Sequence, residues 1–460
     1  MKNKRPQQLS SPTISPFTPL MLATALVFSV PLSAYASAEN TSPSPVTATS
    51  ANEFLNSIGA NTAVSRRGER LKQTRNALDY TGVRWIRTGY ETNAPLADLL
   101  SLHKDTGVKF SYGLLSGGTD IARLIKDGKQ LAAQDALLAL EGVNEPNNWG
   151  IKYQEQKGAG QAHSWLPVAK LQKDLYQAVK SDPDLADIPV WHISENGAQS
   201  DNAGLQYLEI PEGADALLPA GTKYADFANV HNYIIHPKNP HLADNQTWSA
   251  ADPGPHSRVS SLYEHYGKTW FRSFPGYDEQ ALSSLPRVTT ETGLRIEGEI
   301  NEEKHARLIV NMYLAQFKRG WSYTALYLLR DRVDEGGNQK FGLYKPDYSP
   351  RKAADYLHNL THILADKKHS SPLSSLAYEL PNQPKTVHDL LLQKSDGTFE
   401  LVVWGEKVSG SEEVVVKFAK AQEKVRIYDI TKGTMAVKTL SNTETVKLTL
   451  SDYPMIIEIL

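Results

Sequence analysis

Two glutamates follow apolar runs at positions where their carboxyl groups could act together. Glu145 ends the run LLALEGVNE (residues 137–145), and Pro146 after it has no backbone N–H, so it helps to stop a strand there. Glu291 lies near the end of RVTTETG (287–293), where Gly293 marks a turn. Hydrolysis of a glycosidic bond needs such a pair, because one carboxyl group protonates the leaving oxygen while the other acts as nucleophile or base.

Both runs belong to a series of strand-like segments that alternate with amphipathic segments between residues 54 and 369. These segments are rich in Val, Ile and aromatic residues, as buried strands are; they are SIGAN (57–61), VRWIRT (83–88), VKFSYGLL (108–115), LLALEGVNE (137–145), IPVWHIS (188–194), FANVHNY (227–233), RVTTET (287–292) and YTALYLL (323–329). The alternation predicts an α/β fold, a (β/α)₈ TIM barrel. A doubly wound open sheet is the alternative, but no Gly-rich phosphate-binding sequence follows the first strand.

Catalytic groups of such barrels lie at the carboxyl ends of the strands. Glu145 on the fourth strand and Glu291 on the seventh are therefore expected to meet at one rim. Helices are expected over 166–180, over 301–317 with Asn301 as N-cap, and over 349–364 with Ser349 as N-cap.

The pattern changes after residue 370. Alternating apolar and polar residues recur in six short segments, with turn residues such as Gly397 and Gly433 between some of them; the segments are 398–406, 412–418, 423–430, 435–440, 444–450 and 455–460. Residues 370–460 are therefore predicted to form a small C-terminal all-β sandwich behind the barrel.

The N-terminus has the composition of a secretory signal. A basic start (Lys2, Lys4, Arg5) precedes an apolar stretch (19–32) and small residues that offer cleavage after Ala36 or Ala38. We predict a signal peptide over 1–38, with an uncleaved anchor as the alternative, and a flexible lead-in over 39–53. The absence of cysteine and the apparent export favour a secreted or periplasmic protein with no membrane span after cleavage, and the formal net charge of -2 argues against nucleic-acid binding.

Asn144-Glu145-Pro146 closing the fourth strand and Glu291 closing the seventh resemble glycoside hydrolase clan A, the retaining (β/α)₈-barrel glycosidases. The β-module resembles one that follows the barrel in several families of this clan, such as the family 39 xylosidase-like enzymes. The resemblance implies that Glu145 is the acid/base and Glu291 the nucleophile. It also implies that Asn144 binds the sugar's 2-hydroxyl, that Arg87 and Tyr233 hold the nucleophile, and that His231 lines the sugar pocket. Many members have a Trp at the end of strand eight, whereas this chain has ALYLLRD, so Tyr327 or another residue must serve there.

Side chains of adjacent strand residues point to opposite faces, so Asn144 and Glu145 can both reach a sugar only if the backbone is irregular at 144–146. Such an irregularity is therefore predicted. Further substrate-binding candidates are Trp149 and Trp191 as stacking platforms and Glu195 after the fifth strand.

Each assignment has a plainer alternative. His231 could be a hydrogen-bonded core histidine, Tyr233 could simply pack, and Arg87 could be a structural ion-pair partner. The acidic group Asp331, Asp334 and Glu335 lacks the EF-hand spacing and is read as a solvated loop, so we expect no metal and no cofactor.

Two functions follow from these observations. The first is an exported retaining glycosidase that acts, as a monomer, on a poly- or oligosaccharide. The alternative is a non-catalytic glycan-binding protein of the cell envelope on the same scaffold.

Overall fold

The structure is a computed structural model of the chain, and it describes residues 42–146, 148–158, 166–194, 223–234, 244–251, 285–334, 340–366 and 372–460. Its centre is a parallel sheet of eight strands in the order β10-β11-β12-β3-β4-β5-β6-β9. The strands are β3 (Ile58–Asn61), β4 (Trp85–Gly89), β5 (Lys109–Leu115), β6 (Leu137–Val143), β9 (Val190–Trp191), β10 (Ala228–Asn229), β11 (Arg287–Thr292) and β12 (Trp321–Leu326).

The sheet closes into a barrel between β9 and β10. Trp191 and Phe227 form a parallel bridge, and two backbone bonds complete the contact: His192 N–H to the Phe227 carbonyl (3.0 Å) and Asp226 N–H to the Val190 carbonyl (2.8 Å). The eight strands predicted from the sequence are thus the eight strands of the barrel, and the predicted (β/α)₈ fold is confirmed.

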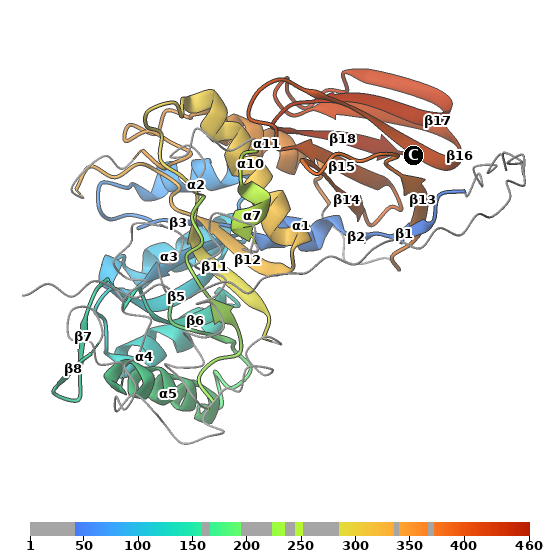
Figure 1. The fold of residues 1–460 in the computed structure, drawn as a ribbon. Helices are drawn as coiled ribbons and strands as arrows, with labels where there is room; N and C mark the ends of the chain where they lie inside the picture. The colour runs from blue at the N-terminus through green and yellow to red at the C-terminus, as the bar shows by residue number, and fades with distance from the viewer. Residues whose placement is uncertain are drawn as a thin grey trace, which may run out of the picture. The chain divides into compact units, whose positions relative to one another are not determined.

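Helices follow most of the barrel strands (Figure 1). The described ones are α1 (Ala51–Ser57), α2 (Leu71–Thr81), the short 3₁₀ helix η1 (Tyr90–Thr92), α3 (Leu96–Thr106), α4 (Ile121–Ala132), α5 (Leu166–Ser181), α7 (Thr247–Ala251), α10 (Glu302–Lys318) and α11 (Lys352–Ile363). Asn301 caps α10 as predicted, with its side chain accepting the Lys304 N–H. The N-cap of α11 is Arg351 and not Ser349, because Pro350 pairs with Tyr344 in a bridge and the helix begins only after it. A small hairpin, β7 (Ile151–Tyr153) and β8 (Gln156–Gly158), follows the fourth strand.

The C-terminal residues form an antiparallel β-module, as predicted, but with different strands. They are β13 (Ser375–Glu379), β14 (Val387–Gln393), β15 (Phe399–Gly405), β16 (Glu412–Asp429), β17 (Lys438–Leu450) and β18 (Pro454–Ile459). The two long strands each join segments that the sequence analysis separated. The irregularity between Lys417 and Gln422 lets β16 pair first with β13 and then with β18 without leaving the ladder with β17.

The prediction of a flexible lead-in over residues 39–53 is wrong for residues 45–53. β1 (Pro45–Thr47) pairs antiparallel with β13, β2 (Thr49–Ser50) pairs parallel with β14, and Ala51 begins α1. These residues supply two strands to the β-module, so their backbone groups are paired within a sheet. The predicted signal peptide, 1–38, lies outside the described residues.

The barrel and the β-module share one hydrophobic core. Seven β-module side chains join the core cluster of the barrel: Leu390, Leu392, Val402, Trp404, Tyr428, Ile430 and Ile456. Asn311 of α10 also donates to the carbonyls of Gly405 (2.9 Å) and Asp452 (3.0 Å). A second cluster, which includes Leu401, Val416 and Ile457, fills the interior of the β-module itself.

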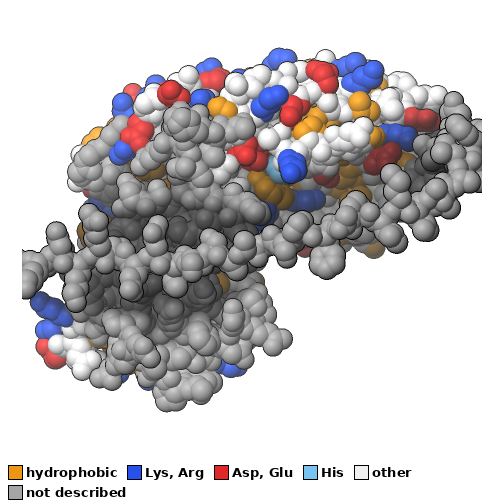
Figure 2. Space-filling model, viewed as in Figure 1, with side chains coloured by type: hydrophobic (Ala, Val, Ile, Leu, Met, Phe, Trp, Pro, Cys, Tyr) orange, Lys and Arg blue, Asp and Glu red, His pale blue; other side chains and the backbone are white. Residues whose placement is uncertain are grey.

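Among the helices that the structure describes, none combines the length and the apolar character that a bilayer span requires. On the face drawn in Figure 2, basic and acidic side chains are interspersed over the described surface.

Candidate active site

The interior of the barrel changes character from one end of the strands to the other. Toward the amino ends, Trp85 and Trp191 meet edge to face with ring centroids 5.4 Å apart, and Phe227 and Tyr323 pack around Trp191. Gly59 makes room for this layer, since an added Cβ there would lie 2.1 Å from the Trp85 ring. Two residues after Trp85 on the same strand face, Arg87 begins a layer of charged groups.

Trp191 is therefore not a sugar platform. The side chain is fully buried within the aromatic layer. The sequence correctly placed Trp191 on the fifth strand but gave no measure of its depth, and β9 pairs it with Glu141 deep in the barrel and not at the rim.

Arg87 on β4 is the centre of the charged layer. Its guanidinium donates to Glu141 (2.7 Å from Nη2), to Glu291 (2.5 Å from Nη1) and to the Asn144 side-chain oxygen (2.7 Å from Nη2). Burial lowers the pKa of Arg87, but the charges of Glu141 and Glu291 more than offset this and raise it. Arg87 consequently stays cationic, with the carboxylate of Glu141 deeper in the barrel and that of Glu291 at the cleft.

Glu291 on β11 accepts a second hydrogen bond, from the Tyr233 hydroxyl at 2.7 Å. Burial and the neighbouring charges of Glu291 and Glu145 raise the pKa of Tyr233 well above its ordinary value, so the phenol stays a donor. Thr290, the residue before Glu291, points into the same interior and donates to Glu141 (2.9 Å). The consecutive residues Thr290 and Glu291 can both point into the barrel because the pairing of β11 with β12 shifts register between Thr289 and Thr292. This irregularity was not predicted from the sequence.

The predicted irregularity at 144–146 is present. β6 ends at Val143, Asn144 forms a single bridge with Ser194, and Glu145 has a φ of 41°, in the left-handed region. The Glu145 N–H donates to the Ser194 carbonyl (2.8 Å), which fixes this turn to the neighbouring strand end. Both Asn144 and Glu145 consequently line the same cleft.

His231 touches Glu145 and does not line the cleft. Its Nδ1 lies 2.7 Å from a Glu145 carboxyl oxygen, and its Nε2 lies 3.1 Å from the Thr290 hydroxyl. Asn148 donates to the other Glu145 oxygen (3.1 Å). Burial raises the pKa of the Glu145 carboxyl, but the hydrogen bond and charge of His231, with help from Asn148 and Arg87, outweigh this and lower it. The predicted role of His231 as a pocket wall is therefore wrong, since the ring is fully buried behind Glu145.

The two catalytic candidates lie close together. One carboxyl oxygen of Glu145, one of Glu291 and a ring nitrogen of His231 all lie within 4.8 Å of one another. In principle such a trio could hold a divalent cation. Both nitrogens of His231 already lie within hydrogen-bonding distance of protein oxygens, and both carboxyl groups accept hydrogen bonds, so the donor set is occupied by the protein itself.

Glu91 is a third carboxyl group of the cleft that the sequence analysis missed. It follows β4 in η1 and accepts backbone hydrogen bonds from Ser116 and Gly118 in the loop after β5. Burial raises the pKa of Glu91 to about 7, against the lowering effect of these bonds and of Arg87. The Ser116 hydroxyl in turn accepts from the Asn144 side chain (3.1 Å), so Glu91 holds the loop that orients Asn144.

The cleft over these groups has a volume of about 680 Å³. Trp149 stands at its edge with 56% of its surface exposed, as a stacking platform requires. Tyr327, the predicted replacement for a strand-eight Trp, lines the cleft, and Phe341 packs edge to face against Tyr327 with ring centroids 5.6 Å apart. The lining also includes Arg67 and Arg332, which the sequence analysis did not single out. Glu195, the remaining candidate, lies outside the described residues.

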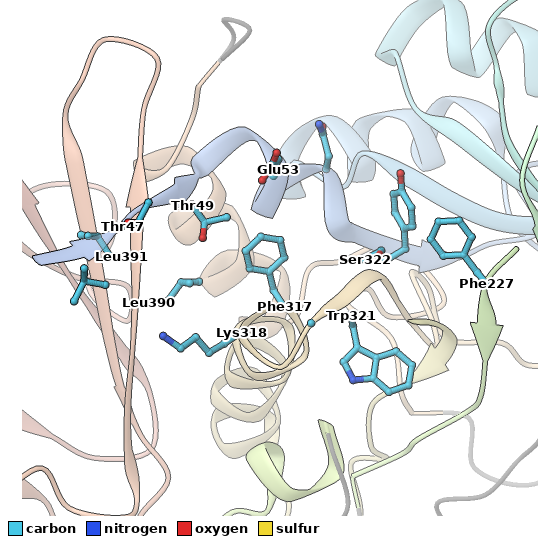
Figure 3. Close-up of a pocket in the computed structure, with 14 residues that line it drawn as sticks. Thr47, Thr49, Glu53, Phe227, Phe317, Lys318, Trp321, Ser322, Leu390 and Leu391 are labelled. Atoms are coloured by element: carbon cyan, nitrogen blue, oxygen red, sulfur yellow. The ribbon is translucent and has the colours of Figure 1, made fainter. Parts of the chain in front are cut away.

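A second cavity, of about 690 Å³, opens where the amino ends of the barrel strands meet the β-module (Figure 3). Thr47 and Thr49, Phe317 at the end of α10, and Phe227 line it. Among its described lining residues Glu53 is the one carboxylate, so it lacks the acid pair that the first cleft has. The prediction of a solvated acidic loop is wrong for Asp331, which is buried and pairs with Arg351. Asp334 pairs with Arg67 at 2.8 Å, and Glu335 lies outside the described residues.

The sequence matches no family model and no curated protein, but its fold resembles solved structures. One is a family 39 glycoside hydrolase from the gut symbiont Bacteroides cellulosilyticus WH2 (TM-score 0.56, 16% identity, 90% of this chain and 83% of that one). Another is a monomeric β-xylosidase from Caulobacter crescentus CB15 (TM-score 0.52, 15% identity, 90% of this chain and 97% of that one). A third is the GH51 arabinofuranosidase from Xanthomonas axonopodis pv. citri (TM-score 0.53, 12% identity, 92% of this chain and 98% of that one).

The chain has the fold of these glycoside hydrolases. The shared part covers the barrel and the β-module together, since about nine-tenths of this chain is matched in each case. At these identities the likeness establishes the architecture predicted from the resemblance to clan A. The chemistry has to be argued from the side chains of the cleft.

Proposed function

We propose that the protein is an exported glycosidase that hydrolyses O-glycosidic bonds of a poly- or oligosaccharide with retention of configuration. The observation that carries this proposal is the proximity of Glu145 and Glu291, since one carboxyl oxygen of each lies within 4.8 Å of the other and both residues line one cleft. Retaining enzymes hold the two carboxyl groups about 5–5.5 Å apart, whereas inverting enzymes leave roughly 6.5–9.5 Å for a water. The short separation supports double displacement.

Glu291 has the surroundings of a nucleophile. Arg87 and the Tyr233 hydroxyl each donate to one of its oxygens, which fixes the orientation of the carboxylate. In the first step a Glu291 oxygen attacks the anomeric carbon, the bond to the leaving oxygen breaks, and a glycosyl ester forms. In the second step water attacks the same carbon, and Glu291 leaves as a carboxylate.

Glu145 supplies the proton of the first step and receives one in the second. The Thr290 hydroxyl donates to Glu141, so its oxygen can accept from His231 Nε2–H, and Nδ1 then faces Glu145. One proton lies between Nδ1 and the carboxyl oxygen over their 2.7 Å contact. A bound sugar that displaces water adds to the burial effect, which raises the pKa of Glu145 and moves this proton toward the carboxyl group.

The proposal is tested with aryl glycosides and a panel of glycans. Xylosides and arabinofuranosides come first, because two of the similar structures are a β-xylosidase and an arabinofuranosidase. The expected result is hydrolysis with a product of unchanged anomeric configuration by NMR, and its loss in Glu291→Gln. Equal activity of both proteins would contradict the role of Glu291 as nucleophile. Activity of neither on the whole panel, while both bind a glycan, would favour the binding protein instead, which has no need of an acid pair.

Export and a monomeric state belong to the same proposal. They are supported by the basic, apolar and small-residue order of residues 1–38 and by the similarity to a β-xylosidase described as monomeric. The N-terminal sequence of the protein recovered from its producing cells is expected to begin after Ala36 or Ala38. An intact Met1 in that protein would contradict cleavage.

A further inference from the structure

The β-module reaches back to a barrel segment next to the catalytic groups. Glu406 follows β15, and its buried carboxylate accepts from the Trp248 N–H (2.6 Å), the Thr247 hydroxyl and His388 Nε2 (3.0 Å). Its backbone carbonyl accepts the Asn245 N–H (2.7 Å), and its neighbour Lys407 forms a bridge with Asp244. One β-module residue therefore holds the start of α7 by both its side chain and its backbone.

Ring contacts add to this attachment. The Trp248 indole stacks on His388 of the β-module, with centroids 4.0 Å apart and planes 11° from parallel. The Arg319 guanidinium lies 4.6 Å from the Trp248 ring centroid. The β-module thus sets the position of α7 through the Glu406 carboxylate and through the stacking of His388 on Trp248.

The other end of α7 contacts the strand segment that carries His231 and Tyr233. The Ala250 carbonyl accepts from the Asn232 side chain (3.0 Å), and Asn232 lies directly between the two. The Asn232 carbonyl accepts from the Thr292 hydroxyl (3.0 Å), and Thr292 follows Glu291. Asn232 therefore connects α7 both to the segment with His231, which contacts Glu145, and to the strand that carries Glu291.

The backbone of this segment is also bonded to the neighbouring strand β11. β10 is two residues long and ends at Asn229, before His231 and Tyr233. Beyond it, the backbone bonds of the segment to β11 and to the turn after it are Val230 N–H to Val288 (3.4 Å) and Ile234 N–H to Gly293 (3.0 Å). The 2.7 Å contacts of His231 with Glu145 and of Tyr233 with Glu291 depend on where this segment lies, and the Asn232 side chain adds a contact with α7 to these backbone bonds.

We propose that Glu406 is a positioning residue for His231 and Tyr233, acting through α7 and Asn232. The β-module is then a structural part of the active site and not a separate sugar-binding appendage. The catalytic consequence rests on the proposed glycosidase function, whereas the mechanical connection does not.

The test compares Glu406→Ala and Glu406→Gln with Asn359→Ala. Asn359 makes another bond between barrel and β-module, to the Ile430 carbonyl (2.8 Å), and does not touch α7. We expect Glu406→Ala to lower kcat about 10- to 100-fold, because displacements near 1 Å at reacting groups cost this much. Glu406→Gln keeps one acceptor and should lose less, and Asn359→Ala should stay within about twofold of wild type while lowering Tm.

Two further measurements separate positioning from general destabilisation. In a double-mutant cycle, Glu406→Ala combined with Asn232→Ala should lose little more kcat than the larger single change, since both lie on one path. Amide hydrogen exchange of residues 230–234 should be faster in Glu406→Ala and Glu406→Gln but not in Asn359→Ala. Additive losses, or unchanged exchange in both Glu406 variants, would overturn the proposal. The exchange measurement remains decisive even if wild type hydrolyses none of the glycans, so failure of the proposed function is recognised separately.

Discussion

The two ends of the barrel interior are built from the same eight strands for opposite purposes. At the amino end, Trp85, Trp191 and Tyr323 fill the space with rings. At the carboxyl end, Arg87 and Glu291 fill it with charge. The aromatic layer excludes water from below the charges, which strengthens their mutual interactions because the local dielectric is low. Depth along a strand, and not the strand alone, therefore decides whether a residue supports stability or chemistry.

The largest expected effect is the loss of activity when a carboxylate is removed at the carboxyl end of the barrel, compared with no loss at the amino end. Glu291→Gln should lower kcat by about 10⁴-fold or more, since the proposed mechanism forms the glycosyl ester on this carboxylate. The measurement is steady-state kinetics on an activated glycoside. Glu53→Gln, in the cavity at the other end of the barrel, removes a carboxylate with the same chemistry and should leave kcat unchanged.

Substitution of Arg87 should lower both the stability and the activity of the protein. Arg87→Met leaves Glu141 buried without its cation, so we expect a loss of about 3–5 kcal/mol in the free energy of unfolding. Because Glu291 and Asn144 lose the same donor, kcat should also fall strongly. Denaturant unfolding and kinetics check the two parts, and normal stability with low activity would show that Glu141 is satisfied without Arg87.

The aromatic end should respond in stability alone. Trp191→Ala is expected to cost about 3–5 kcal/mol in the free energy of unfolding, as large-to-small core changes do. At a temperature where the variant is folded, its KM for a glycan should match wild type. A selective rise in KM would restore Trp191 as a sugar contact.

The pH dependence of stability should also differ between the ends. The pKa of Glu91 is raised by burial to about 7 from 4.5, so the folded protein binds this proton more tightly than the unfolded chain. Its contribution to stability is fully present below pH 4.5 and is lost as pH rises through about 7. The Tm difference between wild type and Glu91→Gln should therefore change over pH 4.5–7, whereas that between wild type and Trp191→Ala should stay constant. A constant difference for Glu91→Gln would contradict this assignment.

The smallest expected effect is at the rim. Trp149→Ala removes an exposed ring, so stability should change by less than about 0.5 kcal/mol. KM for an oligosaccharide should rise several-fold, because a lost stacking contact is worth about 1 kcal/mol. An aryl monosaccharide that does not reach Trp149 is the control, and equal changes for both substrates would contradict stacking.

Much of this arrangement was predictable from the sequence because strand ends are marked by composition. The pairs Glu145–Pro146 and Glu291–Gly293 indicate where strands stop, and a closed barrel brings such ends together. Arg87 and Tyr233 follow from the same rule, with the resemblance to clan A supplying their partners. The left-handed turn at Glu145 was predictable because two adjacent residues had to reach one cleft.

What could not be predicted depends on depth and on distant pairing. Trp191 and Glu141 occupy paired positions on neighbouring strands, and no local pattern shows that this pair is below the rim. Glu91 and Ser116 are the first polar groups after strands two and three, a signal too common to single them out. The strands at 45–50 were missed because their partners, residues 375–377 and 392–393, lie more than 300 residues away.

That pairing binds the beginning of the fold to its end. Val46 pairs with Leu376, so the sheet contacts of β1 cannot form until the chain has been synthesised beyond residue 376. Loop closure over such a span is entropically costly, and folds dominated by distant pairing form slowly. A barrel expressed without the residues after 370 would leave β1 and β2 as unpaired edges, and we expect it to aggregate rather than fold.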